Sequence, residues 1–441
     1  MQKSFGISVL KIMASALNWL TRSSLRAFVF IFILAFGIRA YSIKQIPVIN
    51  LLPKPERELG AIAESLAETG RFADPYIVPT GPTAHLPPIP PAILALIYYW
   101  FGRTNTAAYL YIGFLMATSS LIYALLPWIA DRLGASRQAG LVGGLMGAFM
   151  VETEQPTHGE GLAAIMLGLM LMAFLRRWNG GQNSFTAAFL LGIWSGISFH
   201  VQPALLPVFL GCLAFEISWY SAKKKTATMG VLVLGVVLAC IPWAWRNYTV
   251  FHDFFFIRSN LGLELRMGNS PGVAATFEEM DRAGHRYKHP RATIEEARKV
   301  QQLGEMEYMR EALNESLTWI QDNPLEFFKL TFLRFVHFWF GPLLPSPTSA
   351  LVVALTILAM LGIRRVFPSL TLPQRIILLT PLLTYPLIYY LVPYAPRYRM
   401  PLDWMLFLLA GIEICGWIHF TTRHIHDGQP SLWMAALVRR S

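Results

Sequence analysis

Apolar residues occur in long blocks that are separated by shorter polar stretches. Ten of these blocks approach the length that crosses a bilayer as a helix, roughly 20 residues. They cover about 26–43, 105–129, 139–152, 160–175, 185–200, 203–220, 228–245, 346–363, 374–393 and 401–420. The pattern predicts an all-α polytopic membrane protein with about ten transmembrane helices.

Lys and Arg residues mark one side of this membrane. They precede the first block and fill every second connection, which the positive-inside rule assigns to the cytoplasm. The basic connections contain Arg132 and Arg137, Arg176 and Arg177, Lys223, Lys224 and Lys225, and Arg364, Arg365 and Arg375. We therefore expect a multi-pass protein of the inner (plasma) membrane with both termini in the cytoplasm.

Two connections on the opposite side are long enough to carry structure of their own. The first outer loop covers 44–104, and the large outer loop covers 246–345 with 12 Lys/Arg and 13 Asp/Glu. The predicted organisation is an N-terminal transmembrane region (1–245) that includes the first loop, then the large helical loop. C-terminal transmembrane helices and a cytoplasmic tail follow at 346–441.

Local patterns predict helices in both loops. In the first loop, Leu59, Ile62, Ala63 and Leu66 recur at helical spacing. In the large loop, Thr293 and Glu296 have the spacing of a capping box. Asn323–Pro324 is expected to end one helix and to start another over 325–340.

The block 139–152 is short and rich in glycine. Gly140 and Gly144, like Gly143 and Gly147, have the small-xxx-small spacing that lets helices pack closely. This spacing predicts a tightly packed helix rather than a lipid-facing one.

Composition supports the membrane interpretation. The chain has 441 residues, of which 54% are hydrophobic and 14% charged, whereas soluble domains carry about 25% charged residues. The net charge of +11 predicts no nucleic-acid partner, because 17 of 37 Lys/Arg lie in the predicted cytoplasmic segments. The three cysteines all lie in apolar blocks and have no disulfide or metal-site spacing.

Acidic residues gather on the other side. Of 26 Asp/Glu, five lie between 44 and 104, three between 151 and 160, and 13 between 246 and 345. All 21 are in predicted outer loops. This distribution places any acid–base chemistry at the outer face of the membrane.

Glu56 and Glu58 are the best catalytic candidates. They open the predicted first-loop helix just after the first span, where a partly desolvated carboxylate can act as a general base toward a hydroxyl. Two residues apart on a helix, they point about 200° away from each other, so only one is expected to face a given cavity. The alternative is that both are acids favoured by the helix dipole.

Four basic residues are candidates for binding a lipid-linked phosphate. Arg397 and Arg399 stand in a short outer connection, against the positive-inside trend, and guanidinium groups bind phosphate in bidentate fashion. Arg246 begins the large loop, and His85 lies in the first loop before an apolar segment. Interfacial anchoring among lipid headgroups is the alternative for each.

Further polar residues lie at the outer ends of apolar blocks. Glu152, Glu154, His158 and Glu160 cluster in one outer connection. They could ligate a divalent cation, although their spacing matches no specific metal pattern and no cofactor is firmly implied. Gln202 lies in the next outer connection and is a further candidate.

These motifs together resemble a known family. They are PERELGAIAESL at 55–66, PTAHLPPIPP at 82–91, PWAWRNY at 242–248, GNSP at 268–271 and RYRMP at 397–401. In order and spacing, the chain resembles polytopic C-type membrane glycosyltransferases that use polyprenyl-phosphate-linked sugars. This group includes protein O-mannosyltransferase-like and aminoarabinose-transferase-like enzymes.

The resemblance implies a mechanism and its partners. An acidic residue of the first outer loop orients or deprotonates a lipid, glycan or protein acceptor, which displaces the polyprenyl phosphate with inversion. Basic residues hold that phosphate. The chain departs from the family at two places: Pro55 stands where relatives have the Asp of an Asp-Glu pair, and Gln202 stands where relatives often have Arg.

Two other functions fit the same sequence. A flippase or transporter of lipid-linked sugars should carry ionisable residues along a path through the membrane, and the blocks are nearly free of charge except at Glu216 and Glu413. A catalytically inactive scaffold of the same fold is the other alternative, because of Pro55.

Overall fold

The computed structural model describes residues 19–54, 58–150, 159–180, 184–219, 223–283, 288–342 and 346–426, of which 223–225 and 419–426 are described by backbone alone. Within these ranges helices are the only extended regular elements. Two isolated β-bridges, Ala73–Pro82 and Thr276–Tyr394, join loop segments. The all-α fold class is confirmed for this part of the chain.

The helices divide into two halves of the chain. The first half contains α2 (Ser24–Ser42), η1 (Val48–Leu51), α3 (Glu58–Thr69), α4 (Ile89–Phe101), α5 (Asn105–Ala124), α6 (Leu126–Arg132), α7 (Arg137–Phe149), α8 (Glu160–Trp178), α9 (Phe185–Val201), η2 (Pro203–Leu205) and α10 (Leu206–Trp219). The second half contains α11 (Lys223–Phe251), α12 (Leu261–Gly268), α13 (Phe277–Arg282), α14 (Ile294–Leu303), α15 (Glu305–Asp322), α16 (Pro324–Phe340), α17 (Pro347–Val366), η4 (Phe367–Ser369), α18 (Leu372–Thr384), η5 (Tyr385–Tyr390), η6 (Pro396–Tyr398) and α19 (Met400–His426).

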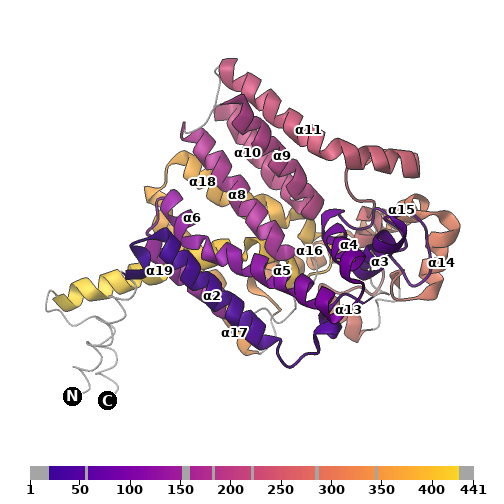
Figure 1. Cartoon of the computed structure of the whole chain (residues 1–441), viewed down its shortest axis with the longest axis horizontal. Helices are drawn as coiled ribbons and strands as arrows, with labels where there is room; N and C mark the ends of the chain where they lie inside the picture. Colours follow the sequence, from indigo (N-terminus) through magenta and orange to yellow (C-terminus); the bar gives the residue numbers. More distant parts are fainter. Residues whose placement is uncertain are drawn as a thin grey trace.

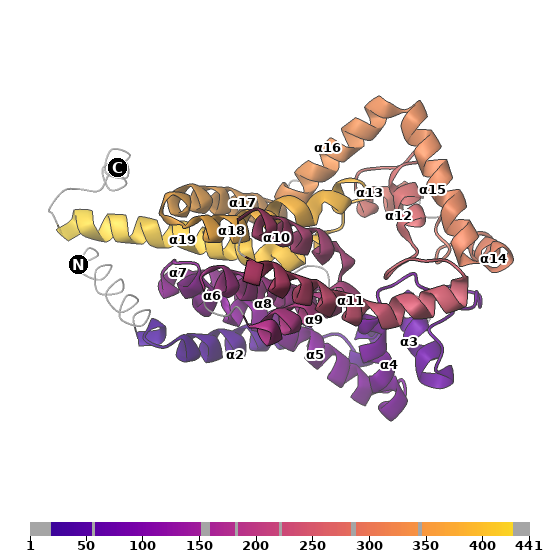
Figure 2. The same cartoon turned by 90° about the horizontal axis from the view of Figure 1, so that it is seen from above.

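The long helices form a bundle, and the loop helices gather at one end of it (Figures 1 and 2). Figure 2 shows the start of α2 and the end of α19 at one end of the molecule, and α3, α4, α12, α14 and α15 at the other. The first outer loop and the large loop, which are far apart in sequence, therefore lie together at one end.

Six helices in the described ranges are long and apolar enough to cross a membrane. The central pair, α8 and α19, is 78% and 72% buried over its apolar windows, whereas α2, α11 and α17 are at most 28% buried. Apolar helix faces that the protein leaves uncovered are the surface that lipid covers, so the chain is a membrane-embedded helical protein.

The remaining four predicted spans form shorter helices. The helices α9, α10 and α18 have 17, 14 and 13 residues, and η5 continues the last of them. The Gly-rich block forms α7, with 13 residues. At 1.5 Å per residue, α7 is about 20 Å long, less than the roughly 30 Å hydrocarbon core.

Glycine lets α7 pack closely, as its spacing predicts. A Cβ atom on Gly140 would lie 2.5 Å from the carbonyl oxygen of Leu126, and one on Gly143 would lie 2.6 Å from that of Phe407. Any larger residue at these positions would clash with a neighbouring backbone. The close approach joins α7 to α6 and α19 inside the bundle.

The loop helices follow the sequence patterns with one correction. The first-loop helix is α3, with Leu59, Ile62 and Ala63 buried, and α16 begins at Pro324 as expected. The predicted capping box at Thr293 forms only in half. Thr293 accepts from the Glu296 N–H, but its own N–H bonds to His289 while the Glu296 carboxylate pairs with Arg266.

Candidate functional site

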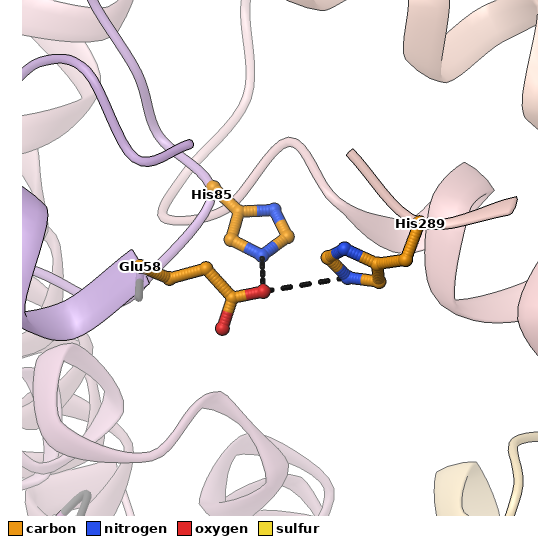
Figure 3. A group of neighbouring side chains, drawn as sticks. All are labelled: Glu58, His85 and His289. Atoms are coloured by element: carbon orange, nitrogen blue, oxygen red, sulfur yellow. Dashed lines mark ion pairs between the residues drawn. The ribbon is translucent and has the colours of Figure 1, made fainter. Parts of the chain in front are cut away.

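The centre of the site is Glu58, the first residue of α3 (Figure 3). Its side chain is only 9% exposed, although a helix N-terminus at a membrane surface would normally leave a carboxylate in water. The apolar face of α3 packs against buried apolar residues of α4 and α5. This packing fixes the start of the helix. Glu58 therefore points into the protein.

Three basic or imidazole groups surround this carboxylate. His85 Nε2 lies 3.5 Å from Glu58 Oε1, and His289 Nε2 lies 3.3 Å from the same oxygen. Arg291 lies 3.5 Å from the second oxygen, Oε2. Figure 3 shows both rings directed at the carboxylate from opposite loops. The first outer loop and the large loop thus meet at one buried acid.

Neighbouring groups fix both imidazoles. His85 Nδ1 lies 3.1 Å from the Tyr76 hydroxyl. His289 Nδ1 accepts the Arg291 backbone N–H at 3.1 Å, which leaves the proton of a neutral ring on Nε2, facing Glu58. Arg266 donates to the Lys288 carbonyl and anchors this segment of the large loop to α12.

The surroundings of Glu58 stabilise its charged form. Burial alone would raise the pKa of Glu58, but the interactions with His85, Arg291 and His289 outweigh burial. The pKa of this carboxyl therefore lies well below its usual value near 4.5. An ionised carboxylate with so low a proton affinity is a weak general base.

The side chains of Glu58, His85 and His289 could together hold a divalent cation. One ligand atom each from Glu58, His85 and His289 lies within 4.8 Å of the others, and two imidazoles with a carboxylate suit zinc or a similar metal. Two features oppose an ion in the present arrangement. The His289 Nε2 proton would have to leave, and the Arg291 guanidinium would lie beside the added positive charge.

A second polar group lies at the same end of the bundle. Glu160 begins α8 and is 5% exposed. Gln202 hydrogen-bonds Tyr385, and the Tyr385 and Tyr389 hydroxyls are 3.3 Å apart. Arg397 precedes α19 and lies 5.5 Å from the centroid of the Tyr398 ring.

Electrostatics connect the two groups. Burial would lower the pKa of Arg397, but attraction from Tyr398, Glu160 and Glu58 raises it above the usual arginine value. Arg397 is therefore a fixed cation within electrostatic range of both buried carboxylates. Glu58 and Glu160 are thus both within electrostatic range of Arg397, at the end of the bundle that carries the loops.

Two of the predicted phosphate ligands instead form contacts within the protein. The Arg399 Nε lies 2.7 Å from Asp403, and a terminal nitrogen donates to the Trp339 carbonyl. Arg246 donates to the backbone carbonyls of Thr83 and Phe72. Both guanidinium groups hold neighbouring segments in place, and their phosphate role stays a prediction.

The remaining candidates lie outside the described residues: Glu56, Glu152, Glu154 and His158. Two residues of the Glu58 group were not predicted from the sequence, namely His289 and Arg291. Their signal is the run Lys288–Arg291 in the acid-rich large loop, where two basic residues and a histidine surround a proline.

No family model matches the chain, and no curated protein matches it either. The family resemblance therefore rests on the motifs alone. The arrangement of Glu58, Arg397 and Glu160 must be interpreted from its own chemistry.

Proposed function

We propose that this chain is an integral-membrane glycosyltransferase. It would move a sugar from a polyprenyl-phosphate donor to a lipid, glycan or protein acceptor at the outer face of the inner membrane. The proposal includes the ten-span topology, in which α7, α9, α10 and α18 cross the membrane with the six longer helices and both termini are cytoplasmic.

One observation carries the proposal: a partly buried arginine lies within electrostatic range of two buried carboxylates at the loop end of a membrane bundle. Arg397 lies in electrostatic range of Glu58 and Glu160. A donor of this class has an anionic phosphate at the membrane surface and a sugar beyond it. A fixed cation beside carboxylates offers one site for the phosphate and others for sugar or acceptor hydroxyls.

The reaction would proceed by a single displacement. The acceptor oxygen or nitrogen forms a bond to the anomeric carbon while the bond from that carbon to the phosphate oxygen breaks. Arg397, assisted by Arg291, would stabilise the charge on the departing phosphate. The acceptor proton passes to a carboxylate. Glu56 fits this role better than Glu58, whose pKa is held low.

Two ion pairs between helices of the bundle speak against a transporter. Arg177 pairs with Glu216, and Arg365 pairs with Glu413. Both pairs are closed contacts between neighbouring helices. Across the described spans they do not continue into a chain of ionisable groups, which a transport path for a charged substrate requires.

The test is sugar transfer from a set of polyprenyl-phosphate donors in proteoliposomes. We expect Arg397→Ala to lower kcat/KM about 10²-fold or more, as loss of a charge-stabilising donor does. Glu56→Gln and Glu58→Gln should each reduce transfer. Glu64→Gln is the matched control, because Glu64 lies on the same helix but pairs with Arg103 at the surface.

The outcomes separate the three functions. Transfer by the wild type that falls in the site variants and persists in Glu64→Gln supports the enzyme. Folded wild-type protein that neither transfers nor hydrolyses any donor contradicts it. In that case, donor movement across the bilayer would identify a flippase, and its absence would favour the scaffold.

A further inference from the structure

The tripeptide Thr83–His85 carries one of the imidazoles that contact Glu58, and its backbone is fully hydrogen-bonded. The Thr83 N–H donates to the Phe72 carbonyl at 3.1 Å, and the Ala84 N–H donates to a Glu305 carboxylate oxygen at 2.7 Å. The His85 N–H donates to the Thr83 hydroxyl at 3.0 Å. The first of these bonds belongs to the isolated Ala73–Pro82 β-bridge, and side chains accept the other two.

The three carbonyls of the tripeptide are satisfied by the large loop. In chain order they accept from the Arg246 guanidinium at 2.8 Å, the Ser259 N–H at 3.1 Å and the Arg258 Nε at 2.9 Å. A buried segment without secondary structure requires such partners for every polar group. The large loop therefore sets the path of Thr83–His85.

Glu305 is the central residue of this contact. It is the first residue of α15 and is only 5% exposed. Besides the Ala84 N–H, its carboxylate accepts from the Thr83 hydroxyl and from the Ser259 hydroxyl at 2.5 Å. The Thr83 hydroxyl in turn accepts the His85 N–H, so a short relay of hydrogen bonds runs from Glu305 to His85.

Nothing in the displacement itself uses Glu305. Its carboxylate accepts hydrogen bonds from the Thr83 hydroxyl, the Ala84 N–H and the Ser259 hydroxyl. These groups belong to the tripeptide or to the residue whose N–H binds the Ala84 carbonyl. A buried carboxylate is costly unless such donors compensate it, and an apolar residue would fill the space without that cost. A buried carboxylate at position 305 is explained if the backbone of Thr83–His85 must be held in one position.

We infer that Glu305 is a positioning residue, which fixes the backbone of Thr83–His85 and thereby holds the His85 ring against Glu58. The inference rests on the proposed function, because it assigns a role in assembling that site. It also makes the large loop a structural requirement for the first loop.

The variants are Glu305→Gln and Thr83→Val, with Glu307→Gln and Thr83→Ser as controls. Glu307 lies in the same first turn of α15 but is exposed and pairs with Arg310. A hydrogen bond to a charged group is worth about tenfold or more. We expect Glu305→Gln and Thr83→Val to lower sugar transfer by about that factor, and both controls to retain it.

Hydrogen exchange gives a readout that does not need activity. We expect the amides of Thr83–His85 to exchange at least about tenfold faster in Glu305→Gln than in the wild type and in Glu307→Gln. If wild-type protein transfers no sugar, the proposed function fails, and the exchange rates still test the positioning role. Unchanged exchange in Glu305→Gln would overturn it.

A double-mutant cycle separates positioning from general support of the fold. In a His85→Ala background, Glu305→Gln should cause no further loss of transfer, because the ring that it positions is already gone. An equal loss in the wild-type and His85→Ala backgrounds would show that Glu305 does not act through His85, and would overturn the inference.

Discussion

The protein holds buried carboxylates at both ends of its bundle, and they differ in their surroundings. At the end without the loops, Glu216 accepts two bonds from Arg177, at 2.8 and 2.6 Å, and one from Trp178 at 3.2 Å. At the loop end, Glu58 has three partners at 3.3 to 3.5 Å, contributed by separate loops.

The difference separates a structural charge from a candidate functional one. The Arg177–Glu216 pair is short, bidentate on the arginine side and joined by Thr228, so its geometry is fully determined by α8, α10 and α11. The contacts of Glu58 are longer than optimal hydrogen bonds. Contacts of this length give way to a ligand or an ion more readily than the short Arg177–Glu216 bonds do.

The largest expected effect is on stability, at the Arg177–Glu216 pair. Arg177→Ala leaves Glu216 charged and buried without its partner, which typically costs about 3–5 kcal/mol. We expect that loss in a denaturant titration of the detergent-solubilised protein, with little change in sugar transfer from the protein that remains folded.

The matched control replaces both partners. Arg177→Met combined with Glu216→Leu removes the charges and keeps the volume, so its free energy of unfolding should return close to the wild-type value. A double variant as unstable as Arg177→Ala would show that the pair itself, and not the uncompensated charge, stabilises the bundle.

A smaller effect, with a defined pH dependence, is expected at Glu58. Because its pKa is lower in the folded state, the folded state binds fewer protons than the unfolded state in the acidic range. Its stabilisation is therefore complete above about pH 5 and is lost as pH falls through the folded-state pKa. Thermal unfolding of wild type and Glu58→Gln between pH 3 and 7 should show a stability difference that shrinks on acidification.

A pH-independent difference between these two proteins would contradict that assignment. Glu64→Gln provides the control, because its carboxylate is partly exposed and pairs with Arg103. We expect its unfolding to follow the wild type across the whole range.

The fold was largely predictable because its main signal is local. Apolar blocks define helices without reference to tertiary contacts, and the described helices follow those blocks closely. Helix length was harder to predict. The block at 374–393 forms only 13 residues of α-helix in α18, because the chain changes to the 3₁₀ helix η5 at Tyr385–Pro386 inside apolar sequence.

The site was predictable only in part. Glu58, His85 and Arg397 were candidates because each stands in a predicted outer connection between apolar segments. His289 could not, since its link to Glu58 spans more than 200 positions and follows no periodicity. For Arg399 and Arg246 the sequence did not reveal the contacts that they make within the protein, with Asp403 and with the Thr83 carbonyl.

The third prediction concerns metal binding at the loop end. Arg291→Ala removes a positive charge beside Glu58, so the affinity of Glu58, His85 and His289 for Zn²⁺ should rise about tenfold, which corresponds to about 1.4 kcal/mol. Competition with a chromophoric chelator measures it. His289→Ala should abolish the binding, and Zn²⁺ bound equally by all three proteins would place it elsewhere.

The smallest effect is expected at the surface. Arg137 and Asp131 form an ion pair at 3.0 Å near the ends of α6 and α7, with both side chains about 40% exposed. Water screens such a pair, and its contribution is typically under about 1 kcal/mol. Asp131→Asn should therefore change the free energy of unfolding far less than Arg177→Ala in the same titration. If the two losses were equal, burial would not be what distinguishes these pairs, and the contrast between Glu216 and Glu58 would have to rest on geometry alone.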